Sequence, residues 1–89
     1  MSKINLIQRL VENGLYYLTE HAYDEAQADG FDVFDVENSL LTGRTRRTWP
    51  RERIIEVVGQ SLDGRPLGAV CRITNGMKVR VITVYEDNP

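Results

Sequence analysis

The stretch that decides the fold is RIIEVVGQSLDGRPLGAVCRITNGMKVRVITVY, residues 53–85. It contains three runs rich in valine and isoleucine, which strands favour, at residues 53–61, 67–74 and 77–85. Asp63-Gly64 and Asn75-Gly76 separate the runs, and both dipeptides favour the two-residue type I′ turn that matches the twist of paired strands. The stretch therefore predicts a three-stranded antiparallel meander.

The pairing of residues across this meander follows if both turns are two-residue loops. Glu56 then lies opposite Cys71, and Cys71 opposite Arg80, all on one face of the sheet. In this register Arg72 and Tyr85 lie on the other face. A one-residue bulge at either turn would move a whole strand to the opposite face, so the buried face stays open at this stage.

The residues before the meander predict helices. Three segments each begin at a side chain that can cap a helix and end at a glycine: Ser2 to Gly14, Thr19 to Gly30 and Asp32 to Gly43. Their apolar residues recur at helical spacing. Residues 15–18 are aromatic and predict a strand or an extended link, and residues 45–49 predict a strand or an arm that Pro50 interrupts or places at a sheet edge.

These elements together predict an α+β fold in one domain, residues 1–89. Two to three N-terminal helices pack on a three- to four-stranded antiparallel sheet. A chain of 89 residues is long enough for one thin core. Its composition, 42% apolar and 27% charged, is that of a globular protein and excludes a disordered chain or a fibre.

Several classes of protein are excluded by what the sequence lacks. No apolar run approaches the roughly 18 residues that span a bilayer, and the N-terminus does not resemble a signal peptide. We therefore expect a cytoplasmic protein with no membrane partner. With one cysteine, Cys71, and one histidine, His21, we expect no disulfide, no metal site and no cofactor. Cys71 lies in a β-prone run and is interpreted as a small buried apolar residue, not a nucleophile.

Charge divides unevenly along the chain. Residues 1–42 carry two basic and eight acidic side chains, whereas residues 43–80 carry nine basic and three acidic ones. An arginine-rich half indicates contact with nucleic acid or phosphate. The alternative is that the two halves attract each other within a compact fold, and a pI near 5.3 argues against strong non-specific binding of nucleic acid.

The order of these motifs resembles a known bacterial family. The motifs are Thr19-Glu20-His21-Ala22, Asp35-Val36, the run 55–59, the hairpin 62–67 and the ending Val81-Ile82-Thr83-Val84-Tyr85. Together, from about Leu6 to Tyr85, they resemble the family called domain of unknown function 4258. That family is in turn similar to RelE-type and BrnT-type toxins, which are small ribonucleases with helices on an antiparallel sheet. The chain departs from its relatives at residues 27–30, where they usually carry an arginine.

The resemblance implies RNA cleavage without a metal ion, which needs a base, an acid and cations that stabilise a charged phosphorane. His21 is the side chain whose ordinary pKa suits proton transfer near neutrality. Glu56 is a candidate base with Arg80 holding phosphate, and Tyr85 a candidate donor to the leaving oxygen or a stacking platform. Each has a structural alternative: His21 as a packing or capping residue, Glu56–Arg80 as a cross-strand pair, and Tyr85 as a core residue.

A second group of candidates would bind RNA. Arginine contacts phosphate bidentately, and an indole stacks on an unpaired base. The candidates with these properties are Arg46, Arg47, Trp49, Arg53 and Arg72. The alternative is a solvated edge segment with Trp49 folded onto the sheet.

Two hypotheses about function remain. The first is a toxin-like, metal-independent endoribonuclease or RNA-binding domain, with RNA and an antitoxin-like protein as partners. The second is a catalytically silent protein-binding module with the same fold. The RNA target and the oligomeric state do not follow from the sequence.

Overall fold

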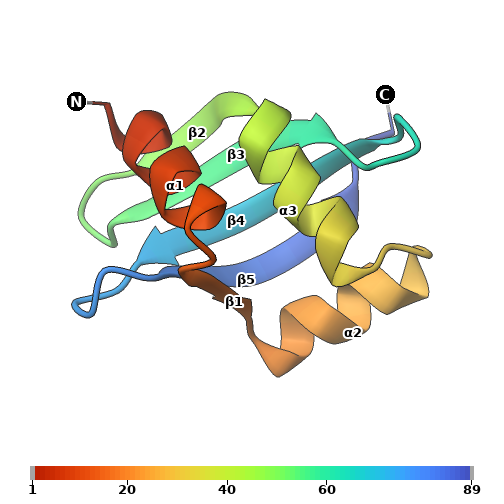
Figure 1. Ribbon diagram of the computed structural model, residues 1–89, viewed down its shortest axis with the longest axis horizontal. Helices are drawn as coiled ribbons and strands as arrows, with labels where there is room; N and C mark the ends of the chain where they lie inside the picture. Colours follow the sequence, from red (N-terminus) through yellow and green to blue (C-terminus); the bar gives the residue numbers. More distant parts are fainter. Residues whose placement is uncertain (1, 89) are drawn as a thin grey trace.

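The computed structural model describes residues 2–88, which form three helices and a sheet. In chain order the elements are α1 (Lys3–Glu12), β1 (Tyr16–Leu18), α2 (Glu20–Ala28), α3 (Val33–Thr42), β2 (Arg44–Trp49), β3 (Ile54–Gln60), β4 (Pro66–Ile73) and β5 (Val79–Glu86) (Figure 1). The strands lie in the order β1-β5-β4-β3-β2. The expected α+β class is therefore confirmed.

The sheet differs from the expected one in strand number and direction. It has five strands, and β1 pairs with β5 in parallel, with Tyr17 opposite Arg80, whereas the other pairs are antiparallel. Strand β1 has only three residues, so its sequence pattern is too short to predict which strand it pairs with. The pairing depends on the hydrogen bonds that β1 supplies to the edge of β5, such as the Val79 N–H donated to the Leu15 carbonyl.

The helices begin and end close to the predicted residues. Ser2 accepts a hydrogen bond from the Asn5 N–H, and Thr19 from the Ala22 N–H. Asp32 and Asp35 form a reciprocal capping box. These side chains satisfy N–H groups that the first helical turn leaves free, which is why the local sequence is enough to locate the helices.

The predicted two-residue turns are wrong, because both hairpin loops contain three residues. The Ser61 N–H donates to the Arg65 carbonyl and the Thr74 N–H to the Lys78 carbonyl, each at 2.8 Å. In each loop the third residue has a left-handed backbone: Gly64 has φ 86° and Met77 has φ 60°. A turn followed by one left-handed residue is the usual three-residue hairpin loop.

The extra loop residue shifts the register, so the predicted row Glu56–Cys71–Arg80 is wrong. Cys71 pairs instead with Ile55 on one side and Val81 on the other, while Glu56 pairs with Val70. Arg80 lies directly opposite Arg72. Glu56 and Arg80 thus remain on the same face, and Arg72 joins them.

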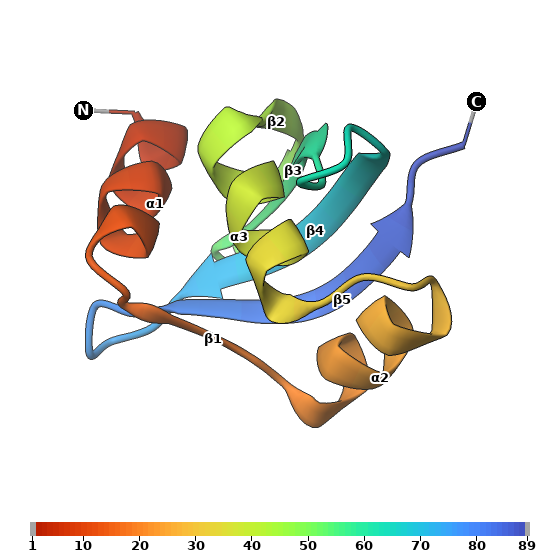
Figure 2. The ribbon, with the colours of Figure 1, turned by 45° about the vertical axis from the view of Figure 1, so that its right-hand side comes forward.

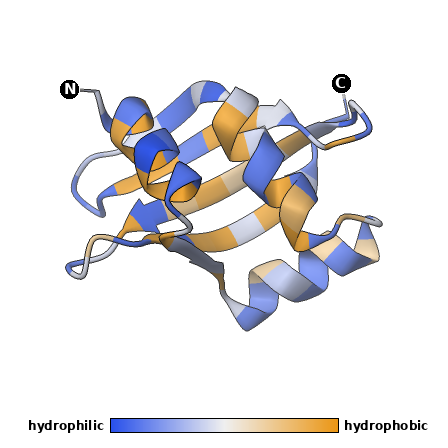
Figure 3. Cartoon of the chain, viewed as in Figure 1, coloured by the Kyte–Doolittle hydropathy of each residue, from blue (hydrophilic) through white to orange (hydrophobic). Residues whose placement is uncertain are grey.

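Helices α1 and α3 pack on one face of the sheet, and α2 lies along the edge of β5 beyond the end of β1, where Glu25 and Asp29 accept the Val84 and Glu86 N–H groups (Figure 2). The apolar side of the sheet faces α1 and α3, as the orange bands of the strands show (Figure 3). The strands bury Ile55, Val57, Leu67, Ala69, Cys71, Val79, Val81 and Val84, and the helices contribute Ile7, Leu10, Val11, Ala22, Ala26, Val36 and Leu40. Cys71 is fully buried, as predicted, and burial raises the pKa of its thiol to about 12. None of the helices in residues 2–88 is long and apolar enough to cross a membrane.

No helix of residues 2–88 covers the opposite face of the sheet, and we call it the open face. Strand alternation places three rows of side chains there. The first row runs from β1 to β2 and contains Tyr17, Arg80, Arg72, Ile54 and Trp49. The other two rows run from β5 to β2 and contain Thr83, Val70, Glu56 and Arg47, and Tyr85, Gly68, Val58 and Arg44. Most of the candidate residues therefore lie on one surface.

Candidate functional site

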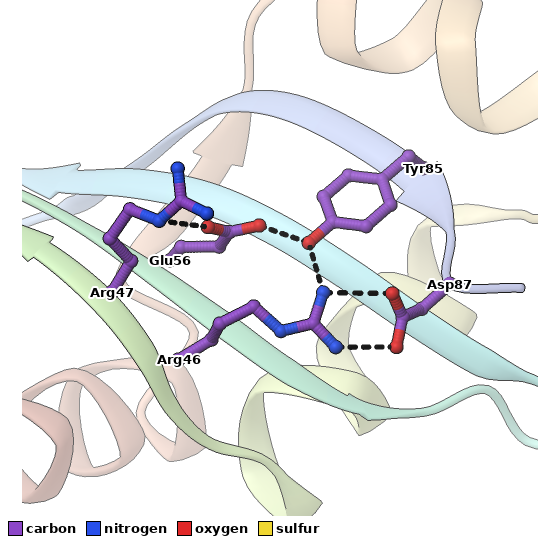
Figure 4. Close-up of polar contacts among 5 residues, drawn as sticks. All are labelled: Arg46, Arg47, Glu56, Tyr85 and Asp87. Carbon is purple, nitrogen blue, oxygen red and sulfur yellow. Dashed lines mark hydrogen bonds and ion pairs between the residues drawn. The ribbon is translucent and has the colours of Figure 1, made fainter. Parts of the chain in front are cut away.

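Five polar side chains form a connected group on the open face (Figure 4). The Tyr85 hydroxyl donates a hydrogen bond to Glu56 and accepts one from Arg46 at 3.3 Å. Arg46 also donates to both carboxylate oxygens of Asp87, at 2.8 and 2.6 Å. Arg47 Nε lies 3.9 Å from Glu56 Oε1. We call these five residues the Glu56–Tyr85 cluster.

Two β-bulges bring the cluster together. In β5 the pairing shifts between Val70 and Cys71, which leaves Ile82 without a partner and turns Tyr85 to the open face. In β2 the pairing shifts between Thr45 and Arg47, so Arg46 is the extra residue. A bulge re-aims the side chains beyond it, and here both bulges direct side chains towards Glu56.

Burial and charge set the protonation of the cluster. Partial burial and the hydrogen bond to Glu56 raise the pKa of Tyr85 to about 12. The Arg46 guanidinium holds the pKa of Asp87 below its ordinary value, and Asp87 raises the pKa of Arg46. Tyr85 is therefore a phenol that keeps its proton at neutral pH, in contact with a carboxylate that is almost buried (side chain 11% exposed).

Arg72 and Arg80 form a second group on the open face, in the row of side chains next to the row that contains Glu56. Arg72 and Arg80 are direct cross-strand partners, and both are exposed. A hollow of about 230 Å³ opens beside them, lined also by Thr74 and Asn75. Neither arginine forms an ion pair with a carboxylate in residues 2–88.

A larger hollow, of about 660 Å³, lies beside the cluster along β2 and β3. Arg44, Arg46, Val58 and Pro66 are among the residues that line it. Arginine side chains thus border open space on both sides of the Glu56–Tyr85 cluster.

Arg65 differs from these arginines because its guanidinium makes contacts that stabilise the fold. Its guanidinium donates to Glu86 and to the Asp29 carbonyl, and lies 4.2 Å from the centroid of the Phe31 ring. It therefore connects the β3–β4 loop to the end of α2 and to β5.

The structure does not bring His21 together with the other candidates. Its side chain is 70% exposed on α2, with Nε2 3.2 Å from Glu25 Oε1. Helix α2 lies at the edge of β5, where the same Glu25 oxygen accepts the Val84 N–H, whereas Arg72 and Arg80 lie on the open face. Within residues 2–88 the imidazole forms no ion pair or hydrogen bond with the Glu56–Tyr85 cluster, and its contact is with Glu25 at the edge of β5.

The remaining RNA-binding candidates lie around the same surface. Trp49 is half-buried at the end of β2, with the Arg47 guanidinium 5.5 Å from its ring centroid. Arg53 was expected at the start of a strand. It lies instead in the β2–β3 turn with φ 57°, where its N–H donates to the Pro50 carbonyl, so that expectation is wrong.

Besides Asn75, which lines the smaller hollow, sequence reasoning missed four residues that shape the site. Gly68 lies under the Tyr85 ring, Asp87 pairs with Arg46, Tyr17 lies beside Arg80, and Thr74 lines the smaller hollow. A glycine within a strand indicates the close approach of another group, so the sequence could have predicted that a side chain packs over Gly68. The other three depend on the register and on the parallel strand β1.

The fold and the site define an α+β domain in which, over the described residues, two helices cover one face of a five-stranded mixed sheet and a third lies at its edge. A family model described as a domain of unknown function (DUF4258) matches residues 18–86. The chain belongs to that family, and the resemblance to this family seen in its sequence is confirmed over residues 18–86. No curated protein and no solved structure matches the chain.

Proposed function

We propose that the open face binds single-stranded RNA and that the Glu56–Tyr85 cluster cleaves it without a metal ion. The observation that carries the proposal is a buried carboxylate, hydrogen-bonded to a protonated phenol, on a sheet face that arginines border and no helix covers. Such a group provides a base, an acid and cations in one place.

The proposed reaction is transfer of the phosphodiester within RNA. Glu56 takes the proton of a ribose 2′-hydroxyl, and the 2′-oxygen attacks the adjacent phosphorus. The bond from phosphorus to the 5′-oxygen breaks, and that oxygen takes a proton from Tyr85, which recovers one from Glu56 through their hydrogen bond. The products are a 2′,3′-cyclic phosphate and a 5′-hydroxyl, and no redox partner is needed.

Arginines would supply the charge that the transition state needs. Arg47 is 65% exposed and only 3.9 Å from Glu56, so it can turn towards a phosphate beside the carboxylate. Its movement would also uncover Glu56. The guanidinium of Arg46, bound to Asp87, instead orients the Tyr85 hydroxyl.

We also propose that the protein resembles RelE-type and BrnT-type toxins in its function. A toxin of that kind would act on RNA in the cytoplasm and be held inactive by an antitoxin-like protein. The geometry of the cluster favours Glu56 and Tyr85 over His21 as the groups that move protons, because His21 contacts Glu25 at the edge of β5 and is not part of the connected group.

Cleavage of a single-stranded RNA in the presence of a chelator tests the proposal. We expect the wild type to yield 2′,3′-cyclic phosphate ends, and Glu56→Gln and Tyr85→Phe to slow the reaction by about 10²- to 10⁴-fold, the usual contribution of acid–base catalysis. Both variants keep the size of the side chain. Arg9→Ala, on α1, is the control and keeps full activity. Absence of cleavage by the wild type, or equal rates in all four proteins, would refute the proposal.

A second function, a silent protein-binding module, is favoured by the edge strand β2. In the described sheet β2 has a hydrogen-bonded neighbour on one side only, and most of its six residues are exposed. An extended segment of another protein can add to such an edge. Co-purification of a partner without any RNase activity would select this function over the first.

A further inference from the structure

The clearest unexplained feature of the open face is the pairing of Arg72 with Arg80. Like charges directly opposite each other in neighbouring strands are destabilising. Three other arginines lie close to carboxylates: Arg46 to Asp87, Arg47 to Glu56 and Arg65 to Glu86. No carboxylate within residues 2–88 forms an ion pair with Arg72 or Arg80, so an external anion would relieve the repulsion between them.

The space beside the two arginines suits a small anion with several acceptor oxygens. Arg72 and Arg80 line the hollow of about 230 Å³ together with Thr74 and Asn75. The Thr74 hydroxyl oxygen accepts the Lys78 N–H at 3.2 Å, which leaves its proton for a ligand. The Asn75 amide adds further donors. Arginine, hydroxyl and amide donors are the groups that contact phosphate oxygens.

An aromatic ring continues the same row. Tyr17 pairs with Arg80 from the other side, and its side chain lies on the open face with the residue 43% exposed. Unpaired bases stack on exposed aromatic rings, and the charged groups beside the ring hold the backbone. The row therefore offers a platform for a base next to donors for a phosphate.

We infer that Arg72, Arg80, Thr74 and Asn75 form a phosphate subsite, with Tyr17 as the platform for the adjoining base. The inference rests on the proposed function for the identity of its ligand, a nucleotide unit of single-stranded RNA. Arg72 lies on the neighbouring strand, two residues along β4 from Val70, the cross-strand partner of Glu56. The backbones of Arg72 and Glu56 are therefore roughly 8 Å apart. The subsite would hold the strand next to the bond that is cleaved.

Titration with inorganic phosphate, followed by NMR at constant ionic strength with chloride as the reference, tests the subsite without RNA. We expect saturable shifts at the Thr74 and Asn75 amides, at least tenfold weaker binding in Arg72→Gln and Arg80→Gln, and unchanged binding in Arg9→Gln. Equal binding in all four proteins, or no saturable shift, would overturn the inference.

The thermal midpoint gives a second readout. In low salt without phosphate, Arg80→Gln should melt at a higher temperature than the wild type, because the like-charge pair is removed. Phosphate should raise the midpoint of the wild type more than that of the variant. A variant that melts lower and responds equally to phosphate would contradict the inference.

A single-stranded oligoribonucleotide, with and without a 5′-phosphate, separates this inference from the proposed function. Weaker RNA binding in Arg80→Gln and in Tyr17→Ala supports the subsite. A similar loss for both oligonucleotides identifies an internal phosphate as the ligand, whereas a loss confined to the 5′-phosphorylated one identifies a terminal phosphate. RNA binding unaffected by either substitution refutes the role of the subsite and leaves the proposed function intact. Phosphate binding without RNA binding refutes the proposed function and leaves the anion site intact.

Discussion

The ring of Tyr85 packs directly over the backbone of Gly68, its cross-strand partner. A Cβ atom at Gly68 would overlap the ring and hydroxyl of Tyr85. The absence of a side chain at this one position lets the phenol lie low across the sheet, where it reaches Glu56. The geometry of the cluster thus depends on a residue with no functional group.

Gly68→Ala should lift Tyr85 and break its contact with Glu56. We expect a loss of about 1–3 kcal/mol in the free energy of unfolding, the usual cost of overpacking, together with loss of RNA cleavage. Urea denaturation measures the first and the chelator assay the second. Gly76→Ala, whose Cβ would meet only Thr74 Oγ1 at 3.8 Å, is the control for stability. Equal stabilities of the two variants would show that Tyr85 does not need the space.

Met77 tests the three-residue loop of the second hairpin. Because its φ is 60°, glycine should fit better and raise the free energy of unfolding by roughly 0.5–1 kcal/mol, less than the full left-handed penalty because glycine also costs entropy. Met77→Val should lower it, since a β-branched residue is strained in this region. Thermal or urea unfolding of the two variants, compared with the wild type, measures both changes in stability. The reverse order would mean that position 77 is not left-handed.

Stability at high pH should report the Tyr85–Glu56 contact. The pKa of Tyr85 rises from 10.0 to about 12, so the folded state favours the protonated phenol. This contribution to stability is complete below pH 10 and is lost as the pH rises through 12. Tyr85→Phe should therefore lose less stability than the wild type between pH 10 and 12.

Tyr16 provides a matched comparison for this measurement. Burial and a hydrogen bond to Glu37 also raise its pKa to about 12. Phenolate absorbance should show a component near pH 12 that shrinks in either single Phe variant and disappears in the double variant. An unchanged titration curve in Tyr85→Phe would contradict the burial and hydrogen bonding of this phenol.

His21→Ala should leave RNA binding and cleavage within about twofold of the wild type. The imidazole is exposed on α2 and contacts Glu25 at the edge of β5, outside the Glu56–Tyr85 cluster. Initial rates at two pH values, measured beside Glu56→Gln, provide the check. A large loss in His21→Ala with full activity in Glu56→Gln would place the chemistry at α2 instead of the Glu56–Tyr85 cluster.

Local sequence was enough for the elements and for most of the candidate residues. Caps such as Ser2, Thr19 and Asp32 and the glycines that follow the helices have local effects, so the helices were found close to their true bounds. Arg46, Arg47, Glu56 and Tyr85 were all singled out by chemistry, and the structure brings them together.

The face on which each residue lies could not be predicted, because it depends on one-residue irregularities. The two three-residue loops and the bulges at Arg46 and Ile82 each shift a strand by one position. Asn75-Gly76 looked like a complete turn, but Met77 adopts the left-handed conformation instead. The parallel partner of β1 is more than 60 residues away in the chain, and no local pattern identifies it.

NMR mapping with a single-stranded oligoribonucleotide in a chelating buffer tests the central claim most directly. We predict that the amides of Glu56, Val70, Arg72 and Arg80, together with those of β2, shift on titration while the outward residues of α1 and α2 do not. Shifts confined to the helices, or no shift at any RNA concentration, would contradict an RNA-binding open face.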